Sequence, residues 1–274
     1  METFGIAVVL GVVEGLTEFL PVSSTGHLII AGHLLGFVGE KAASFEVAIQ
    51  LGAILSVVFL YWRRFLALLP TTDGGAGPSS STLRSWAGVL RLGLATLPAL
   101  VVGFLARHAI KEHLFTPDAV TAALFVGGVM ILVAERFTSR RPTNSIESIS
   151  VAQSLGVGLF QVLALWPGTS RSAATIVGGM LVGLDRKGAA EFSFLIAVPI
   201  MCIATGYEMV KMRSLFAVQD TMQFALGFGV SFVVALITVK AFVLFLGRGS
   251  LAPFAWYRMI AAPLFYFLTR SVRF

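Results

Sequence analysis

Long apolar stretches recur along the whole chain and are separated by short polar connectors. A helix needs roughly 20 apolar residues to cross the hydrocarbon core of a membrane. Six stretches reach or approach that length: 42–62, 85–106, 118–135, 190–209, 222–246 and 253–270. The pattern predicts an all-α polytopic membrane protein with six transmembrane helices, in which residues 1–274 form a single integral-membrane domain.

Two other apolar stretches are interrupted by polar residues. Residues 3–36 are broken by "PVSSTGH", and residues 152–184 are broken by "WPGTSRS". The pieces after each break, 27–36 and 173–184, are too short to span a membrane. Irregular backbone at that depth is tolerated only where it is buried in protein or lines a wet cavity. Each broken stretch therefore predicts a re-entrant helical hairpin.

The two broken stretches are related to each other. An offset of 146 residues pairs four identical residue types: Pro21 with Pro167, Ser24 with Ser170, Ile30 with Ile176 and Gly32 with Gly178. Each half then contains one hairpin and three spans, and three is odd, so the second half must lie upside down relative to the first. The sequence predicts inverted repeats over 1–135 and 151–274. In such repeats, discontinuous helices bring their polar breaks together near the midplane.

Composition and charge agree with this class of protein. The chain has 274 residues, of which 57% are hydrophobic and 12% charged. Its mean hydropathy is +0.88, and soluble domains carry about 25% charged residues. The formal net charge is +6, but excess Lys and Arg in short loops is ordinary topology signalling. No basic run with interleaved aromatic residues is present, so we expect membrane lipids and no nucleic acid as partners.

The first break carries carboxylates. Glu14 and Glu18 are four residues apart and share one face of a helix. Carboxylates within a membrane are costly unless they are paired with a cation, a metal or a proton. Hard oxygen ligands suit Mg²⁺ or Ca²⁺, particularly beside a phosphate. The pair predicts a divalent-metal site; the alternative is that both side chains face an aqueous vestibule.

The same break carries hydroxyls and an imidazole, in the run Ser23-Ser24-Thr25-Gly26-His27. Helix capping accounts for the hydroxyls but not for the histidine. Ser24 and His27 are close enough for the imidazole to reach the hydroxyl if the backbone turns at Gly26. A serine needs an adjacent base to act as a nucleophile, and the N–H groups at the start of a helix bind anions. The run predicts Ser24 as the nucleophile and His27 as its base.

The second break supplies a cation. In "PGTSRSAAT", Arg171 is flanked by Ser170 and Ser172 and followed by Thr175, directly before a predicted helix. The planar guanidinium presents a fork of donors that matches phosphate oxygens. This segment predicts a phosphate cradle; the alternative is that Arg171 only pairs with Glu14 or Glu18.

Other polar residues in the apolar stretches are less informative. Glu46 and Gln50 are again four residues apart, and either line the same cavity or make an ordinary interhelical hydrogen bond. Four further residues could snorkel or form ion pairs, and the sequence does not separate these possibilities: Arg91, Glu191, Lys240 and Arg258.

These motifs together resemble the bacterial undecaprenyl pyrophosphate phosphatases of the bacitracin-resistance family. The resemblance is carried by "GVVEGLTEFLPVSSTGHLIIAGHLLG", "FEVAIQLGAIL", "ALWPGTSRSAATIVGGML" and "EFSFLIAVP", and it covers essentially the whole chain. It implies hydrolysis of undecaprenyl pyrophosphate to undecaprenyl phosphate and inorganic phosphate. This reaction recycles the lipid carrier of cell-wall synthesis and confers bacitracin resistance. It also implies a multi-pass protein of the bacterial cytoplasmic (inner) membrane and leaves a homodimer open.

The resemblance also implies residue roles. Ser24, His27, Glu18 and Arg171 would be catalytic, and Glu14 and Glu18 would hold Mg²⁺ or Ca²⁺. Expected substrate contacts are Ser23, Thr25, Gly26, Ser170, Ser172, Thr175 and Gln50. In one scheme Ser24 attacks phosphorus; in the other, His27 or a glutamate activates water.

A second class of function is a transporter or flippase for the lipid carrier or an ion, because inverted repeats with broken helices are a transporter design. A Ser-His pair opposite an arginine favours the phosphatase.

Overall fold

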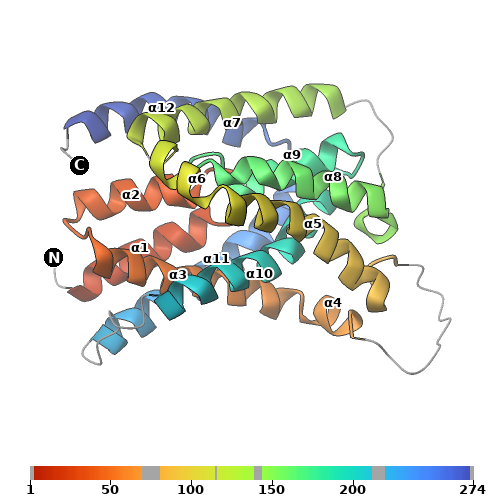
Figure 1. Ribbon diagram of the computed structural model, residues 1–274, viewed down its shortest axis with the longest axis horizontal. Coiled ribbons are helices and arrows are strands. Elements are labelled where there is room, and N and C mark those ends of the chain that lie inside the picture. The colour runs from red at the N-terminus through yellow and green to blue at the C-terminus, as the bar shows by residue number, and fades with distance from the viewer. Residues whose placement is uncertain (1–2, 70–80, 115, 139–143, 212–219, 272–274) are drawn as a thin grey trace.

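The computed structural model describes residues 3–69, 81–114, 116–138, 144–211 and 220–271, and this part of the chain is helical with short connections (Figure 1). The predicted 71–82 loop lies almost entirely outside the described residues, as do residues 139–143 of the linker between the halves. The α-helices of the first half are α1 (Thr3–Thr17), α2 (Ser24–Leu34), α3 (Glu40–Leu60), α4 (Trp62–Ala67), α5 (Ser85–Leu105), α6 (Arg107–His113) and α7 (Pro117–Thr138). Those of the second half are α8 (Val151–Gln161), α9 (Arg171–Leu181), α10 (Arg186–Lys211), α11 (Thr221–Leu246) and α12 (Ala252–Ser271), with short 3-10 helices η1 (Ile146–Ser148) and η2 (Val162–Leu165).

Five of the six predicted spans are helices long and apolar enough to cross a membrane: α3, α5, α7, α10 and α11. The sixth prediction, 253–270, coincides with α12, which has 20 residues but is not in that group. The hydropathy of α12 is lowered by one charged residue, two amphipathic aromatic residues and two prolines: Arg258, Trp256, Tyr257, Pro253 and Pro263. Over the residues that the structure describes, the protein is therefore an all-α polytopic membrane protein.

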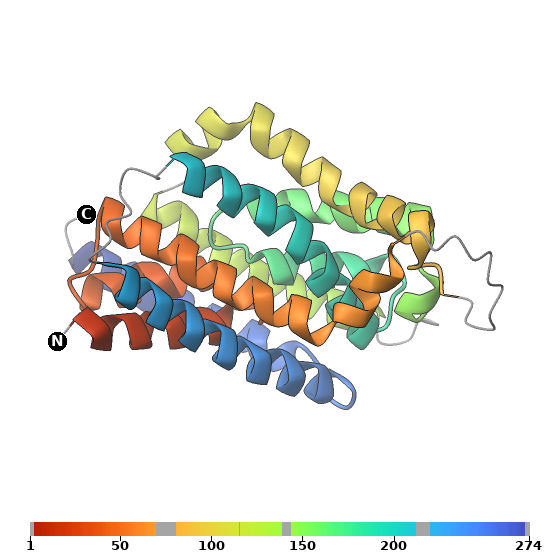
Figure 2. The ribbon, with the colours of Figure 1, turned by 90° about the horizontal axis from the view of Figure 1, so that it is seen from below.

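The two broken stretches form helical hairpins at opposite ends of the molecule. Figure 1 shows α1 and α2 at the end where both chain termini lie, and α8 and α9 toward the other end, with the starts of α2 and α9 between them; Figure 2 again places both termini at one end. Proline disfavours a helical conformation at the residue before it, and Trp166, which precedes Pro167, is extended. In each hairpin the proline lies in the non-helical segment between the two helices, Pro21 between α1 and α2 and Pro167 between η2 and α9.

The structure gives the two hairpins a slightly different register from the predicted one. Both α2 and α9 have 11 residues. Each follows a serine in the left-handed region, Ser23 with φ 75° and Ser170 with φ 73°. The predicted offset pairs Ser170 with Ser24, whereas the backbone pairs it with Ser23, one residue earlier. Ser24 and Arg171 are then the equivalent first residues of the two helices. The inverted repeats over 1–135 and 151–274 stay a prediction.

The two halves are interleaved. Helix α11 packs on α1 and α3, while α5 packs on α8 and α7 on α12. Helix α1 approaches α11 so closely that a Cβ at Gly11 would lie 2.8 Å from the Gly227 carbonyl oxygen, and a Cβ at Gly15 would lie 2.8 Å from that of Ser231. Small residues at such contacts let membrane helices approach each other closely. This packing fixes the first break against helices of the second half.

A buried carboxylate fastens the end of the molecule that holds the second hairpin. Glu135, near the end of α7, accepts hydrogen bonds from the Arg186 guanidinium at the start of α10. It also accepts one from the backbone N–H of Leu251, directly before α12, at 2.7 Å. One side chain thus joins three long helices.

Candidate active site

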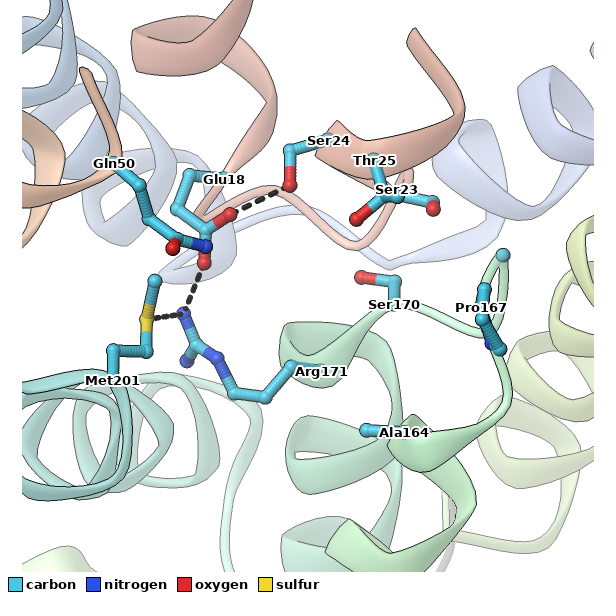
Figure 3. Close-up of a pocket in the computed structure, with 11 residues that line it drawn as sticks. Glu18, Ser23, Ser24, Thr25, Gln50, Ala164, Pro167, Ser170, Arg171 and Met201 are labelled. Carbon is cyan, nitrogen blue, oxygen red and sulfur yellow. Dashed lines mark hydrogen bonds and ion pairs between the residues drawn. The ribbon is translucent and has the colours of Figure 1, made fainter. Parts of the chain in front are cut away.

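The two breaks enclose a polar pocket of about 130 Å³ (Figure 3). On this measure a cavity needs only about 10–15 Å³ to hold one water, so the pocket has room for a phosphoryl group. It is lined by residues of both hairpins and of α3 and α10: Glu18, Ser23, Ser24, Thr25, Gln50, Ala164, Pro167, Gly168, Ser170, Arg171 and Met201. The prediction that the polar breaks meet inside the molecule is confirmed.

Glu18 connects the two breaks. The Ser24 hydroxyl donates a hydrogen bond of 2.6 Å to Glu18 Oε2, and Arg171 Nη2 donates one of 3.0 Å to Oε1 (Figure 3). The Glu18 side chain is 6% exposed and that of Arg171 is 13% exposed. Charge-assisted hydrogen bonds of this kind are about twice as strong as neutral ones. A single carboxylate therefore fixes Ser24 and Arg171 relative to each other.

The Arg171 guanidinium is held on several sides. Its Nη1 donates to the Ser193 carbonyl at 3.1 Å, and its Cζ lies 5.4 Å from the centre of the Phe19 ring. Within the described part of the chain, buried Nε has no hydrogen-bond partner. The predicted alternative, a pair with Glu18, does form. The guanidinium still lines the pocket and keeps one donor without a partner among the described residues.

The expected hydrogen bond between Ser24 and His27 does not form. His27 Nδ1 donates to the Ser23 carbonyl at 2.7 Å, and Nε2 is hydrogen-bonded to the Tyr257 hydroxyl of α12. The imidazole also packs edge-on against Phe265. The reason is helical geometry: Ser24, the first residue of α2, reaches back to Glu18, whereas His27 faces α12. The carboxylate beside Ser24 is that of Glu18, so the predicted contact between Ser24 and His27 is wrong, and the catalytic role of His27 stays a prediction.

The predicted substrate contacts divide into two groups. Ser23, Thr25, Ser170 and Gln50 line the pocket, as expected. Gly26, Ser172 and Thr175 do not, and all three are buried.

Each of these buried residues has another partner. Ser172 donates to the Leu20 carbonyl at 2.7 Å, which ties the two breaks together. Thr175 donates to the Arg171 carbonyl at 2.8 Å, and a Cβ at Gly26 would meet the Phe265 ring at 3.4 Å. These three residues therefore pack around the pocket and do not line it.

Glu14 does not line the pocket. Its side chain is buried, and neither carboxylate oxygen has a hydrogen-bond partner in the described part of the chain. A buried carboxylate without a partner calls for a cation or a proton. The described residues contain no group of three or more His, Cys, Asp or Glu side chains that could hold a metal. Mg²⁺, however, commonly uses one or two carboxylates together with substrate phosphates, and Glu14 fits that donor set.

Three features of the site were not singled out from the sequence. Met201 lines the pocket and contacts Arg171, Ser193 supports Arg171, and Tyr257 holds His27. Of these three residues, only Tyr257 could have been found from the sequence, because it stands next to Arg258 in an otherwise apolar predicted span.

A family model described as "Bacitracin resistance protein BacA" matches residues 7–264, which include both breaks and every residue that lines the pocket. The chain belongs to the BacA family. Its similarity to curated proteins is also high along its length. It is 55% identical to the undecaprenyl-diphosphatase of Maridesulfovibrio salexigens over 267 residues, which are 97% of this chain and 99% of that protein.

Two further relatives carry the same name. The undecaprenyl-diphosphatase of Nitratidesulfovibrio vulgaris (strain DP4) is 55% identical over 95% of this chain and 96% of its own. That of Desulfovibrio desulfuricans is 49% identical over 97% of this chain and 98% of its own. The resemblance identified from the two break motifs is thus confirmed at the level of the BacA family.

Proposed function

We propose that this BacA-family chain hydrolyses undecaprenyl diphosphate to undecaprenyl phosphate and inorganic phosphate. One observation carries the proposal: Glu18 joins a serine of the first break to an arginine of the second at a polar pocket among apolar helices. The names of the curated relatives support the same substrate.

The surroundings of the pocket suit a lipid with a charged head. Many large apolar side chains are exposed along the long helices, among them Phe59, Leu97, Phe104 and Ile237. An apolar surface of this kind is stable in the hydrocarbon core of a membrane, which would also hold the prenyl tail of the lipid. The diphosphate would meet Arg171 and the hydroxyls of Ser23, Ser24, Thr25 and Ser170 in the pocket.

In the first chemical step, Ser24 Oγ attacks the terminal phosphorus, and its proton passes to Glu18 Oε2. The new Oγ–P bond forms while the bond between the terminal phosphorus and the bridging oxygen breaks, so undecaprenyl phosphate leaves with the bonding electrons. Arg171 stabilises the charge on the transferred phosphoryl oxygens. Phosphoryl transfer depends mainly on such positioning and charge stabilisation.

In the second step, water attacks the phosphoserine. Glu18 first releases to solvent the proton that it took from Ser24, and then accepts a proton from the attacking water. The new bond between the water oxygen and phosphorus forms while the Oγ–P bond breaks, Ser24 Oγ takes the proton from Glu18, and inorganic phosphate leaves. In the alternative scheme Glu18 activates water directly, and Ser24 only binds phosphate. The short Ser24–Glu18 hydrogen bond, at 2.6 Å, favours Ser24 as the nucleophile, because a serine adjacent to a base is the arrangement that nucleophilic catalysis requires.

We also propose a divalent cation, Mg²⁺ or Ca²⁺, bound with the substrate. Glu14 would hold it, since both carboxylate oxygens lack a partner within the described residues. Glu18, the other expected ligand, already bonds Ser24 and Arg171 through its two oxygens. When bound, the ion would neutralise charge on the diphosphate.

The cellular role follows from the reaction. Release of undecaprenyl phosphate would return the lipid carrier to peptidoglycan synthesis and lower sensitivity to bacitracin, and the protein would act in the cytoplasmic (inner) membrane. The pocket is lined by residues from both halves of the chain, and a homodimer stays a prediction.

The test is phosphate release by the purified protein in detergent from undecaprenyl diphosphate, with and without EDTA. We expect activity that EDTA abolishes, loss of activity in Ser24→Ala and Arg171→Ala, and wild-type activity in two exposed controls, Ser145→Ala and Arg107→Ala. A wild-type protein that binds the lipid with Mg²⁺ but releases no phosphate would contradict hydrolysis and favour the transporter or flippase.

A further inference from the structure

Arg258 on α12 is completely buried, with 0% of its surface exposed. Its guanidinium donates hydrogen bonds to four backbone carbonyls. Nη1 reaches Pro21 in the first break at 3.2 Å, and Nη2 reaches Gly168 in the second break at 3.0 Å. Nη2 and Nε also reach Ala123 and Leu124 of α7, at 3.2 and 3.1 Å. Within the described part of the chain, no carboxylate pairs with Arg258.

This arrangement satisfies backbone that the fold leaves irregular. Residues 21 and 168 lie outside helices, so their carbonyls have no helical partner, and an unsatisfied carbonyl in a membrane is strongly unfavourable. The planar fork of an arginine can reach several carbonyls at once, whereas the ammonium of a lysine is a compact point charge. Arg258 therefore acts as a bridge between the two breaks.

The chain leaves space for the bridge. A Cβ added at Gly127 of α7 would collide with Arg258 Nη2. Gly127 therefore provides the room in which the guanidinium turns toward both breaks. Substitution of this glycine would displace the guanidinium without removing its charge.

We propose that Arg258 is a positioning residue that sets the distance between Ser24 and Arg171. Pro21 lies three residues from both Glu18 and Ser24, and Gly168 lies three residues before Arg171. A fixed separation of these two carbonyls fixes the segments that carry the catalytic groups. The inference deepens the proposed function and rests on it, because it assumes that this pocket hydrolyses the lipid diphosphate.

The test compares Arg258→Lys and Gly127→Ala with Gly93→Ala, a matched control on α5 where an added Cβ has nothing within 4 Å. For each purified variant, kcat and KM for phosphate release are measured beside the thermal unfolding midpoint. A misplacement of about 1 Å can cost about 100-fold in rate. We expect kcat to fall about 10- to 100-fold in both test variants and KM to change less than about threefold, with both proteins folded.

Other results overturn the inference. Wild-type kcat in either folded variant would show that the bridge does not set the catalytic geometry. Failure of Arg258→Lys to fold leaves Gly127→Ala to decide, and failure of both would make Arg258 a determinant of folding rather than of position. If the wild type and Gly93→Ala release no phosphate, the proposed function itself has failed.

Discussion

Glu18 is the residue on which the chemistry of the pocket converges. Its spacing from Glu14 predicts a metal ligand, while its contacts with Ser24 and Arg171 assign it the position of a base. Spacing alone could not show this, because Glu18 lies past the end of α1 and reaches across the break. The direction of the His27 side chain could not be predicted from spacing either. His27 lies three residues after Ser24 on α2, and its side chain faces Tyr257.

At this scale we expect Glu18→Gln to lower kcat for phosphate release by a factor of about 10² to 10⁴, the range that positioned bases contribute. The amide keeps the size of the side chain but cannot take the Ser24 proton. Kinetics with undecaprenyl diphosphate give the value. Glu40→Gln, an exposed substitution at the start of α3, is the control. A Glu18→Gln variant with more than half of wild-type activity would exclude Glu18 as the base.

We expect His27→Gln to keep activity within about tenfold of wild type. The imidazole bonds the Ser23 carbonyl and Tyr257 and has no hydrogen bond to Ser24 in the structure. Tyr257→Phe should then have a similarly small effect, since it removes the same contact from the other side. Phosphate release measured in parallel with Ser24→Ala decides the point. A loss in His27→Gln as large as that in Ser24→Ala would restore the imidazole as the base.

Among the elements, those governed by long apolar runs and prolines could be predicted from the sequence. Predicted span 42–62 corresponds to α3 (Glu40–Leu60) and 222–246 to α11 (Thr221–Leu246). The registers of the short polar segments and the directions of their side chains could not be predicted, because both depend on tertiary contacts. The sequence predicts Ser172 and Thr175 as phosphate ligands, yet each side chain donates a hydrogen bond to a backbone carbonyl. Arg258 had no predictable partner because its acceptors come from three segments distant in sequence.

The carboxylate that fastens α7, α10 and α12 gives a stability prediction. We expect Glu135→Gln to destabilise the protein by about 1–3 kcal/mol, since it breaks a largely buried charged hydrogen-bond group. Activity of the folded protein at low temperature should remain near that of wild type, because Glu135 is not among the residues that line the pocket. Thermal unfolding in detergent, with the exposed Glu40→Gln as control, measures the change. An unchanged unfolding midpoint would contradict this role for Glu135.

For the whole molecule, the essential feature is that two hairpins from opposite ends meet in one pocket. The first half contributes Glu18 and Ser24, and the second contributes Arg171. Contacts of α11 with α1 and α3, and of α5 with α8, hold the halves together. Neither half contains a complete site, although the predicted repeats give each half a similar order of elements.

We therefore expect residues 1–140 and 141–274, produced together as separate chains, to copurify and release phosphate. Either fragment alone should be inactive, because Ser24 and Arg171 are then on different proteins. Size-exclusion chromatography and phosphate release test both statements. A first fragment that carries Ser24→Ala should abolish activity of the pair, and activity from one fragment alone would refute a shared site.

The most direct measurement is the stereochemical course at phosphorus, followed with undecaprenyl diphosphate that carries a chiral, isotopically labelled terminal thiophosphate. Attack by Ser24 and then by water inverts phosphorus twice, so we expect the released thiophosphate to retain its configuration. A single attack by water activated by Glu18 inverts it once. Inversion would therefore contradict Ser24 as the nucleophile and leave it as a phosphate ligand.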